Sequence, residues 1–235
     1  INFDSFEPMV QACKKNGIKL FVYASSSSVY GIKNEKNVHE DMTLEPLTDY
    51  SKYKVACEEI LKKHQNENFT TVILRPATVC GFSLRQRMDV IVNLLTNQAF
   101  HLKQIKILGG TQLRPNIHIN DMVNVYLLVL EAPKNLIAGE VFNAGFQNLT
   151  VNQIANSVKN TIDKKVKLKV VKTDDLRSYH ISSKKINKIL KFEPMNTVED
   201  AVSDLKKAFE KNLLPNSLND EKYFNIKQFE KIDLK

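Results

Sequence analysis

The sequence predicts an α/β protein with a mostly parallel sheet and a small additional α/β lobe. Two observations lead to this fold class. Apolar runs of strand length alternate with helical segments along the first half of the chain, which is typical of βαβ units. The chain has 235 residues, 43% of them hydrophobic and 26% charged. That composition indicates a globular protein with one large domain, or one domain and a smaller lobe.

The first predicted elements lead to a run of serines. Residues 6–16 are expected to form a helix that ends at Gly17, because glycine is common directly after a helix. The apolar run 18–23 has the length of a strand, and four serines, Ser25 to Ser28, follow shortly after it. The sequence therefore places a row of hydroxyl groups just beyond a buried strand.

The alternation continues after a loop that reaches Pro46. Thr48 or Asp49 is expected to cap a helix that runs to about residue 66. The next strand is expected at 70–74, stopped by Arg75 and Pro76. Later elements are a helix, a strand at 105–108, a helix at 121–131 and a strand at 140–143.

The pattern changes from Thr150 onward. Thr150 opens a predicted helix that reaches about residue 162, a strand is expected at 166–171, and a second long helix at 197–211. These elements predict a small α/β lobe that interrupts and caps the main sheet. The segment after Pro215 is polar and weakly patterned, so we expect an extended surface segment there.

The charge balance is basic. There are 34 Lys and Arg residues against 26 Asp and Glu, which gives a net charge of +8 and an isoelectric point of about 9.2. Only five of the 34 are Arg, which leaves 29 Lys, and the lysines are spread along the chain without a compact cluster. This pattern is typical of a solvated surface, so we expect no nucleic-acid partner.

Several features exclude other classes of protein. No apolar run approaches the roughly 20 residues that a membrane helix needs, and the first residues lack the pattern of a signal peptide, so no membrane partner is expected. The chain begins with Ile1 instead of Met, and we expect it to be a piece of a longer protein. The three cysteines are far apart and form no C-x-x-C, which favours a reducing cytoplasm. Neither they nor the five scattered histidines have metal-ligand spacing, so no metal is expected.

Two groups of residues have the spacing of a catalytic site. Ligands of open α/β sheets bind beyond the carboxyl ends of strands, where Ser25 to Ser28 are expected. Tyr50 and Lys54 are four residues apart in a predicted helix and therefore share one face. A phenol with a pKa near 10 becomes a useful base at neutral pH when a nearby cation lowers its pKa. A second Y-x-x-x-K, Tyr223 with Lys227, lies in the polar tail and is interpreted as a chance match.

With these motifs the chain resembles a known family, the extended short-chain dehydrogenase/reductases, particularly the nucleotide-sugar epimerases and dehydratases of the UDP-glucose 4-epimerase type. The similarity covers residues 1 to about 205 in the family's order. The matching stretches are 21–31, 46–54, 74–81, 114–121, 139–145 and 175–179. The resemblance implies a Rossmann-like doubly wound parallel sheet, NAD (or NADP) as cofactor and a nucleotide-diphosphate sugar as substrate.

The resemblance also implies roles for individual residues. Tyr50 would be the base and acid that moves the sugar hydroxyl proton, with Lys54 holding the nicotinamide ribose and Ser26 bonding the reacting oxygen. The further residues implied are Asn2, Pro76 and Val79 for the cofactor, and Ser27, Thr78, Arg114 and Arg177 for the substrate. Cys80 stands where the family usually has Tyr, and we interpret it as a small buried residue. Arg114 and Arg177 are expected to clamp the diphosphate, because guanidinium binds such groups with paired hydrogen bonds.

The largest departure from the family is a missing segment. The family opens with a strand and a Gly-x-x-Gly-x-x-Gly turn for the pyrophosphate, and the seven glycines of this chain do not form that spacing. Ser5 and Phe6 also replace the Gly-Thr that follows the family's Asn at the position of Asn2. The chain is therefore expected to be either a fragment or a remnant that has lost its cofactor half, and the intact Ser26, Tyr50 and Lys54 favour a fragment.

The resemblance implies three parts of the chain. Residues 1–149 would be the C-terminal part of the NAD-binding domain with interleaved substrate-lobe segments, 150–214 mainly the substrate-binding lobe, and 215–235 a surface tail. The full-length protein is expected to be a cytoplasmic homodimer that epimerises a nucleotide sugar, at C4 through a transient keto-sugar, for surface polysaccharide synthesis.

Other functions remain open at this point. A keto-reductase or a dehydratase is an alternative within the family, although the dehydratases carry Asp and Glu where this chain has Ser27 and Ser28. A non-catalytic nucleotide-sugar-binding remnant is an alternative of another class. A nucleic-acid-binding protein is supported only by the net charge of +8. The identity of the sugar, the nucleotide and the choice of NAD or NADP stay open.

Overall fold

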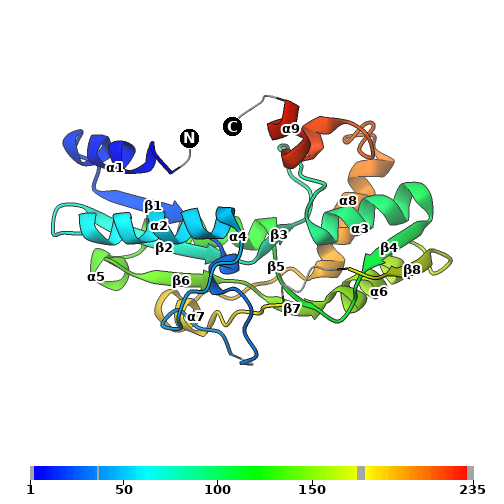
Figure 1. Ribbon diagram of the computed structural model, residues 1–235, viewed down its shortest axis with the longest axis horizontal. Helices are drawn as coiled ribbons and strands as arrows, with labels where there is room; N and C mark the ends of the chain where they lie inside the picture. The colour runs from blue at the N-terminus through cyan, green and yellow to red at the C-terminus, as the bar shows by residue number, and fades with distance from the viewer. Residues whose placement is uncertain (1–2, 36, 174–177, 232–235) are drawn as a thin grey trace. The chain divides into compact units, whose positions relative to one another are not determined.

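The computed structural model describes residues 3–35, 37–173 and 178–231 (Figure 1). The chain divides into two compact units. Unit 1 comprises Ile1–Ala77, Met122–Phe146 and Arg177–Pro194, and unit 2 comprises Thr78–Asp121, Gln147–Leu176 and Met195–Lys235. The two units interleave along the chain, and the predicted division into domains at residue 150 stays a prediction.

Unit 1 is built on a parallel sheet in the order β1-β2-β6. The strands are β1 (Leu20–Ala24), β2 (Thr70–Pro76) and β6 (Val141–Ala144). β2 lies in the centre and is buried from Thr70 to Arg75, which explains its continuous run of apolar and β-branched residues. The predicted α/β class with a parallel sheet is confirmed.

Helices pack on this sheet through a compact apolar cluster. The helices of unit 1 are α1 (Phe6–Lys15), α2 (Asp49–His64), most of α4 (Ile119–Glu131), α5 (Lys134–Ile137) and α7 (Lys184–Leu190), and the 3₁₀ turn η1 (Ser27–Tyr30) follows β1. Phe6 and Val10 of α1 and Leu61 of α2 are buried in one cluster with Phe69 and Ile73. Gly17 ends α1 as predicted, and the N–H groups of Gly17 and Ile18 return to the helix carbonyls in a Schellman arrangement.

Unit 2 contains two small sheets and a group of three helices. β5 (Leu113–His118) pairs in parallel with β3 (Thr78–Cys80) and antiparallel with β7 (Gln147–Thr150). β4 (Gln104–Leu108) pairs in parallel with β8 (Lys167–Val171). α3 (Ile91–Leu102), α6 (Val151–Ile162) and α8 (Val198–Glu210) enclose the largest part of the core of this unit.

Threonine caps set where several helices begin. Thr48, Thr150 and Thr197 each accept a hydrogen bond from the backbone three residues later, and the side chain at that position bonds back to the cap. Such a capping box satisfies two backbone N–H groups that a helix start leaves free. These caps explain why the predicted helices after Thr48, Thr150 and Thr197 have the correct starting points.

The predicted extended surface segment after Pro215 is wrong. This part of the chain forms the 3₁₀ turn η2 (Glu221–Tyr223) and the helix α9 (Asn225–Lys231). Tyr223 is buried with Met88 and Leu205 in an apolar cluster, and its backbone carbonyl accepts a bond of 2.8 Å from the N–H of Met88. The buried hydroxyl of Ser217 donates to the Oδ1 of Asn97 at 2.7 Å. One buried aromatic side chain and several hydrogen bonds therefore hold this segment, which is why its polar composition gave no core signal.

No helix in the described part of the chain is long and apolar enough to cross a membrane.

Gly31 is the glycine whose replacement the fold tolerates least. Its φ is +71°, and an added Cβ would lie 2.1 Å from the carbonyl oxygen of Glu45. We expect Gly31→Ala to lower the free energy of unfolding by about 2–5 kcal/mol, from backbone strain and the clash together. Urea unfolding of the complete protein measures this.

Gly17→Ala is the matched control. Its φ is +74° but no atom lies within 4 Å of the added Cβ, so only the backbone strain of about 1–2 kcal/mol is expected. Equal losses in the two variants would show that the contact with Glu45 does not matter.

Candidate functional site

The serines lie just beyond the carboxyl end of β1, as predicted. The N–H of Ser25 donates to the carbonyl of Leu74 at 2.8 Å, which extends the β1–β2 pairing by one residue. Ser26 caps η1, because its Oγ accepts the N–H of Ser28 at 3.1 Å. The hydroxyls of Ser26 and Ser28 are 2.9 Å apart, and Ser27 is buried. The local turn therefore fixes Ser26 by its own hydrogen bonds.

Lys54 ties helix α2 to the end of the same strand. Its Nζ donates to the carbonyl of Ala24, the last residue of β1, at 2.7 Å. The Nζ also lies 4.8 Å from the ring centroid of Tyr23 and 5.6 Å from that of Tyr50. Burial lowers the pKa of Lys54, while Cys57 and Glu58 act in the opposite direction. The predicted pairing of Tyr50 and Lys54 on one face of a helix is therefore present in the structure.

A pocket opens beside these two side chains. It has a volume of about 560 Å³ and is lined mainly by apolar and aromatic side chains. Its lining residues are Ser5, Phe6, Met9, Phe21, Val22, Tyr23, Tyr50, Tyr53, Lys54 and Cys57. Tyr50 is 58% exposed, so its phenol is accessible from this pocket. An apolar pocket with a single ammonium and an accessible phenol is suited to a flat organic ligand and a proton transfer.

A buried ion pair lies behind the serine loop. Arg75 of β2 donates from Nε and Nη2 to the two carboxylate oxygens of Glu58 in α2, at 3.0 and 2.6 Å. The Oγ of Ser25 donates to the same carboxylate at 2.5 Å. Burial lowers the pKa of Arg75, but its bonds to Glu58 and Tyr30 outweigh burial and the net shift is upward. The paired charges join the strand, the helix and the serine loop.

The remaining guanidinium nitrogen of Arg75 extends this network. Its Nη1 donates to the hydroxyl of Tyr30 at 2.8 Å and to the carbonyl of Glu40 at 3.1 Å. The Tyr30 hydroxyl in turn donates to the Oδ1 of Asn143 at 2.8 Å, and the carboxylate of Glu40 accepts the N–H of Asn143 at 2.7 Å. Burial raises the pKa of both Tyr30 and Glu40, which favours their neutral forms.

Sequence reasoning did not identify this network. One signal was available, because Arg75 stands directly after an apolar strand and a buried arginine requires an acidic partner. Glu58 follows Lys54 by four residues and shares its helix face, yet nothing in the sequence connects it to Arg75.

The other predicted residues fall in both units. Pro76 ends β2 in unit 1 and pairs with Ala144. Thr78 and Val79 begin β3 in unit 2, and Arg114 lies in β5, where its Nη1 donates to the carbonyl of Leu113 at 2.9 Å. Asn2 and Arg177 lie outside the described residues.

Cys80 is a buried residue, as the sequence suggested. Its Sγ donates to the carbonyl of Ile117, and burial, with a smaller effect of Asp121, raises the pKa of the thiol to about 12. A thiol that stays protonated at neutral pH is a poor nucleophile.

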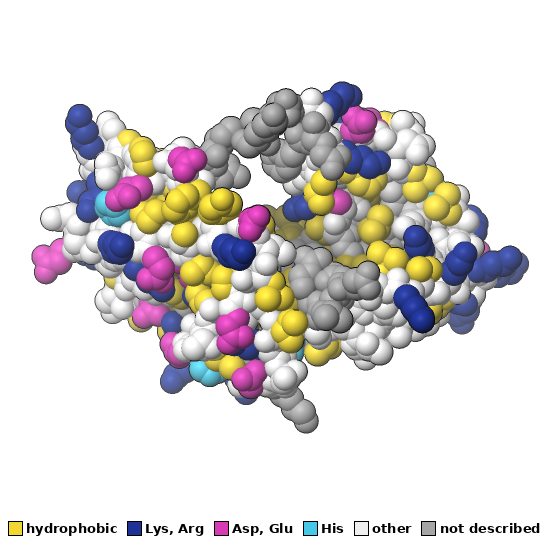
Figure 2. Space-filling view, in the orientation of Figure 1, with side chains coloured by type: hydrophobic (Ala, Val, Ile, Leu, Met, Phe, Trp, Pro, Cys, Tyr) yellow, Lys and Arg dark blue, Asp and Glu magenta, His cyan; other side chains and the backbone are white. Residues whose placement is uncertain are grey.

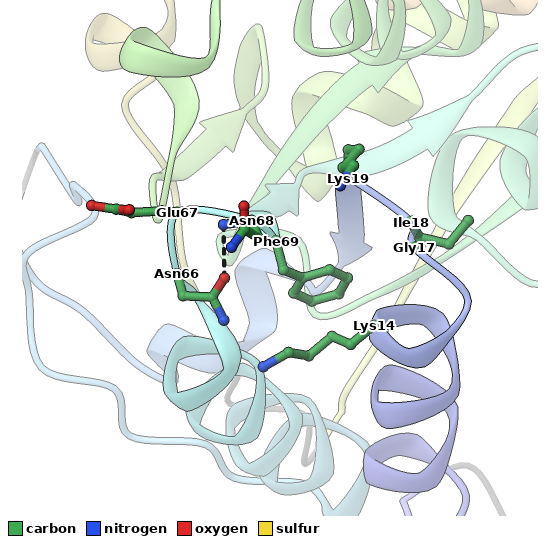
Figure 3. A pocket seen from close by; sticks show the side chains of 8 residues that line it. All are labelled: Lys14, Gly17, Ile18, Lys19, Asn66, Glu67, Asn68 and Phe69. Carbon is green, nitrogen blue, oxygen red and sulfur yellow. Dashed lines mark hydrogen bonds between the residues drawn. The ribbon is translucent and has the colours of Figure 1, made fainter.

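A second pocket lies at the opposite end of the strands (Figure 3). It has a volume of about 480 Å³ and is lined by Lys14, Gly17, Ile18, Lys19 and residues 66–69. Lys14 donates to the carbonyl of His64 at 3.3 Å. This pocket lies where β1 and β2 begin, and it contains none of the predicted site residues. Because ligands of open α/β sheets bind beyond the carboxyl ends of strands, the pocket with Tyr50 and Lys54 is the better candidate.

Comparison with known proteins identifies relatives of the chain. The family model described as "NAD dependent epimerase/dehydratase family" matches residues 1–145. An uncharacterized UDP-glucose epimerase of Bacillus subtilis (strain 168), YtcB, is 30% identical over 209 residues, with 86% of this chain and 64% of the relative covered. The N-acetyl-α-D-glucosaminyl-diphospho-ditrans,octacis-undecaprenol 4-epimerase of Escherichia coli O157:H7 is also 30% identical, with 71% of this chain and 49% of the relative covered. The chain thus spans about half to two thirds of the length of these relatives.

A solved structure agrees with this comparison. The crystal structure of UDP-glucuronic acid 4-epimerase from Bacillus cereus, in complex with UDP-glucuronic acid and NAD, matches with a TM-score of 0.81 and 28% identity. The match covers 90% of this chain and 68% of that protein.

Removal of either partner of the Arg75–Glu58 pair should strongly destabilise the protein. Arg75→Leu and Glu58→Leu each leave an uncompensated buried charge, and each should lower the free energy of unfolding by about 3–5 kcal/mol. The double variant leaves no such charge and should lose clearly less than the sum. Urea unfolding of the complete protein and its three variants measures the coupling energy.

The exposed Lys62–Glu59 pair of the same helix, 2.8 Å apart, is the control, with an expected coupling below about 1 kcal/mol. Additive losses at Arg75 and Glu58 would contradict the assignment of this pair as the central interaction.

Proposed function

Because the chain belongs to the NAD dependent epimerase/dehydratase family, we propose that the complete protein is an NAD-dependent nucleotide-sugar epimerase. The observation that carries this proposal is the placement of Tyr50 and Lys54 in one pocket, with the Lys54 ammonium fixed at the carboxyl end of β1 next to the serine loop. The epimerase names of the relatives support the same reaction class. The proposed site of inversion is C4, and the product would serve surface polysaccharide synthesis.

The residues present fit the nicotinamide end of the cofactor. The Lys54 ammonium has three N–H groups and uses one on Ala24, so two remain for ribose hydroxyls. Pro76 and Val79 are proposed to border the nicotinamide, and Asn2 is proposed as a further contact.

The chain's glycines do not form the spacing of a pyrophosphate-binding turn, so the other end of the cofactor needs further residues of the complete protein. When bound, NAD would accept a hydride from the sugar carbon and return it.

The chain's own residues would then manage the proton and the sugar. The Tyr50 phenolate takes the proton of the sugar hydroxyl as the carbon is oxidised, and returns it after the keto-sugar has turned over. The Lys54 ammonium stabilises this phenolate by charge. The Ser26 hydroxyl donates to the reacting oxygen, which holds it in line with Tyr50. A base held by a helix and a donor held by a cap keep this geometry without rearrangement.

We propose four residues for substrate binding. Ser27 and Thr78 contact the sugar, and Arg114 and Arg177 hold the diphosphate with paired hydrogen bonds. The segment 150–214 is proposed as the main part of the substrate lobe. We also propose that the complete protein is a homodimer. The three cysteines are free thiols, which is consistent with a cytoplasmic location.

Loss of the Tyr50 hydroxyl should remove activity selectively. Tyr50→Phe should lower kcat about 100- to 10,000-fold with little change in nucleotide-sugar affinity, because it removes a proton transfer and little binding. Steady-state kinetics of the complete protein with a UDP-hexose, together with isothermal titration of the same ligand, would measure both quantities.

Tyr53→Phe is the matched control, since Tyr53 lies on the same helix and is 55% exposed, close to the 58% of Tyr50. It should keep kcat within about threefold, an effect under 1 kcal/mol. Equal losses in both variants would overturn the role of Tyr50. Binding of the sugar nucleotide without turnover by the intact protein would instead favour the non-catalytic alternative.

The reaction should not eliminate water. Elimination of water requires carboxylates that transfer protons at the sugar carbons next to the oxidised carbon. Ser27 and Ser28 occupy the two positions where the dehydratases carry these carboxylates. Ser27 is buried, and the Ser28 hydroxyl is bonded to Ser26. Mass spectrometry of the products from UDP- and dTDP-hexoses should show only isomers of unchanged mass. A 4-keto-6-deoxy product would show that the dehydratase alternative is correct.

A further inference from the structure

One sheet of unit 2 concentrates the positive charge of the chain. Residues 103–108 and 163–172 form β4, β8 and the segments that flank them, and they contain seven lysines and one acidic residue, Asp163. The lysines are Lys103, Lys106, Lys164, Lys165, Lys167, Lys169 and Lys172. The whole chain has 34 basic and 26 acidic side chains. Without these seven lysines and Asp163 it has 27 basic and 25 acidic side chains, a net charge of only +2. The prediction that the lysines form no compact cluster is wrong for this sheet.

The strand register places the lysines on one face. β4 and β8 are parallel, with Lys106 opposite Lys169 and Gln104 opposite Lys167. The alternate residues Ile105 and Ile107 of β4 are buried in the core of the unit. Because paired residues of neighbouring strands point to the same side, Lys106, Lys167 and Lys169 lie together on the outer side of this two-stranded sheet. All three are exposed. We call this surface the lysine face.

The lysine face has no acidic partner among the residues that the structure describes. Among residues 3–35, 37–173 and 178–231, none of Lys106, Lys167 and Lys169 takes part in an ion pair. Lysines in unit 1 do have such partners, for example Lys33 with Glu45 at 2.6 Å and Lys185 with Glu140 at 2.7 Å. Like charges held together on a small sheet repel one another. Because these lysines are not paired with acidic groups in the described part of the chain, all of their charges attract an anionic surface that covers them.

Exposed aliphatic side chains accompany the lysines. Leu102 is 56% exposed and Leu108 47%; Leu102 directly precedes this part of the chain, and Leu108 lies on the same side of β4 as Lys106. In Figure 2, basic and hydrophobic side chains lie beside one another over the part of the surface where Figure 1 shows β4 and β8. Residues 103–108 and 163–172 contain no Arg and no aromatic residue. Nucleic-acid surfaces use Arg and stacking aromatics, whereas lysine with exposed aliphatic residues is suited to the headgroup and acyl boundary of a bilayer.

We propose that the lysine face docks the protein on the surface of an anionic lipid bilayer. The lysine ammonium groups contact lipid phosphates, and Leu102 and Leu108 reach the apolar boundary beneath them. This contact is peripheral and needs no membrane-spanning helix, so it replaces the expectation that the protein has no membrane partner. It goes beyond the proposed epimerase activity and does not depend on it, since none of these residues is among those named above for catalysis or for binding of cofactor or substrate.

The test is sedimentation of the complete protein with vesicles. Vesicles of phosphatidylcholine with about one third phosphatidylglycerol should bind it, and vesicles of phosphatidylcholine alone should not. The triple variant Lys106→Gln/Lys167→Gln/Lys169→Gln should reduce the partition coefficient about 100-fold, since each lysine near such a surface contributes about fivefold. High salt should release the wild-type protein, because dissolved ions screen the attraction between the lysine ammonium groups and the lipid phosphates. Leu108→Ser, which keeps all the charges, should reduce binding about fivefold.

A control variant that loses the same number of charges elsewhere distinguishes an effect of the lysine face from an effect of net charge. Lys15→Gln/Lys63→Gln/Lys188→Gln removes three exposed lysines of unit 1 and should change binding less than about fivefold. Equal losses in the two triple variants, or no binding of the wild-type protein to anionic vesicles, would overturn the proposal.

Two other results would overturn it by giving the lysines another role. Tighter binding of poly(U) than of vesicles at the same ionic strength would identify a nucleic-acid surface. Self-association of the Lys106/Lys167/Lys169 variant with unchanged vesicle binding would show that the lysines only protect a sheet edge.

Discussion

The arrangement of the candidate site depends on one buried ion pair, Arg75 with Glu58. A guanidinium inside an apolar core is stable only when its N–H groups have acceptors, and here they are the Glu58 carboxylate, the Tyr30 hydroxyl and the Glu40 carbonyl. These acceptors come from helix α2, from the 3₁₀ turn after β1 and from the loop that follows. Because Lys54 precedes Glu58 by one helical turn, the contact that satisfies Arg75 also sets the position of Lys54 at the end of β1.

The groups around this pair limit its electrostatic cost. The charge of Arg75 faces that of Glu58 at 2.6 Å, and burial raises the pKa of both Glu40 and Tyr30. A raised carboxyl pKa means that Glu40 contributes stability at low pH, which declines as the pH rises through its folded-state pKa. The bond from the N–H of Asn143 and the charges of Lys185 and Arg75 act against this rise. The net charge of this buried cluster is therefore close to zero, although its directional hydrogen bonds remain. These hydrogen bonds fix the position of the serine loop.

The sequence predicted the elements that depend on interactions between residues close in the sequence. It missed those that depend on contacts between residues far apart in the sequence. Gly17 and Thr150 mark helix ends through their own conformation and caps, so the boundaries there are correct. The same holds for Tyr50 and Lys54, whose spacing in one helix determines their common face. β5 was missed because Pro115 interrupts its apolar pattern, and the segment after Pro215 was misassigned because Ser217 is held by a residue 120 positions away. Arg75 and Glu58 are likewise joined only by the fold.

The two groups of lysines show how burial changes what one residue type can do. Lys54 lies against Tyr23 and Tyr50 and gives one N–H to a carbonyl, so desolvation lowers its pKa and its charge acts at short range on the phenol beside it. The lysines of β4 and β8 stay in water, where each charge is screened within about 10 Å and acts mainly as part of a group. A single desolvated ammonium can stabilise one phenolate, whereas a solvated cluster can attract only an extended anionic surface. The fold provides the first by enclosing a helix face in a pocket, and the second by leaving the outer face of a sheet uncovered.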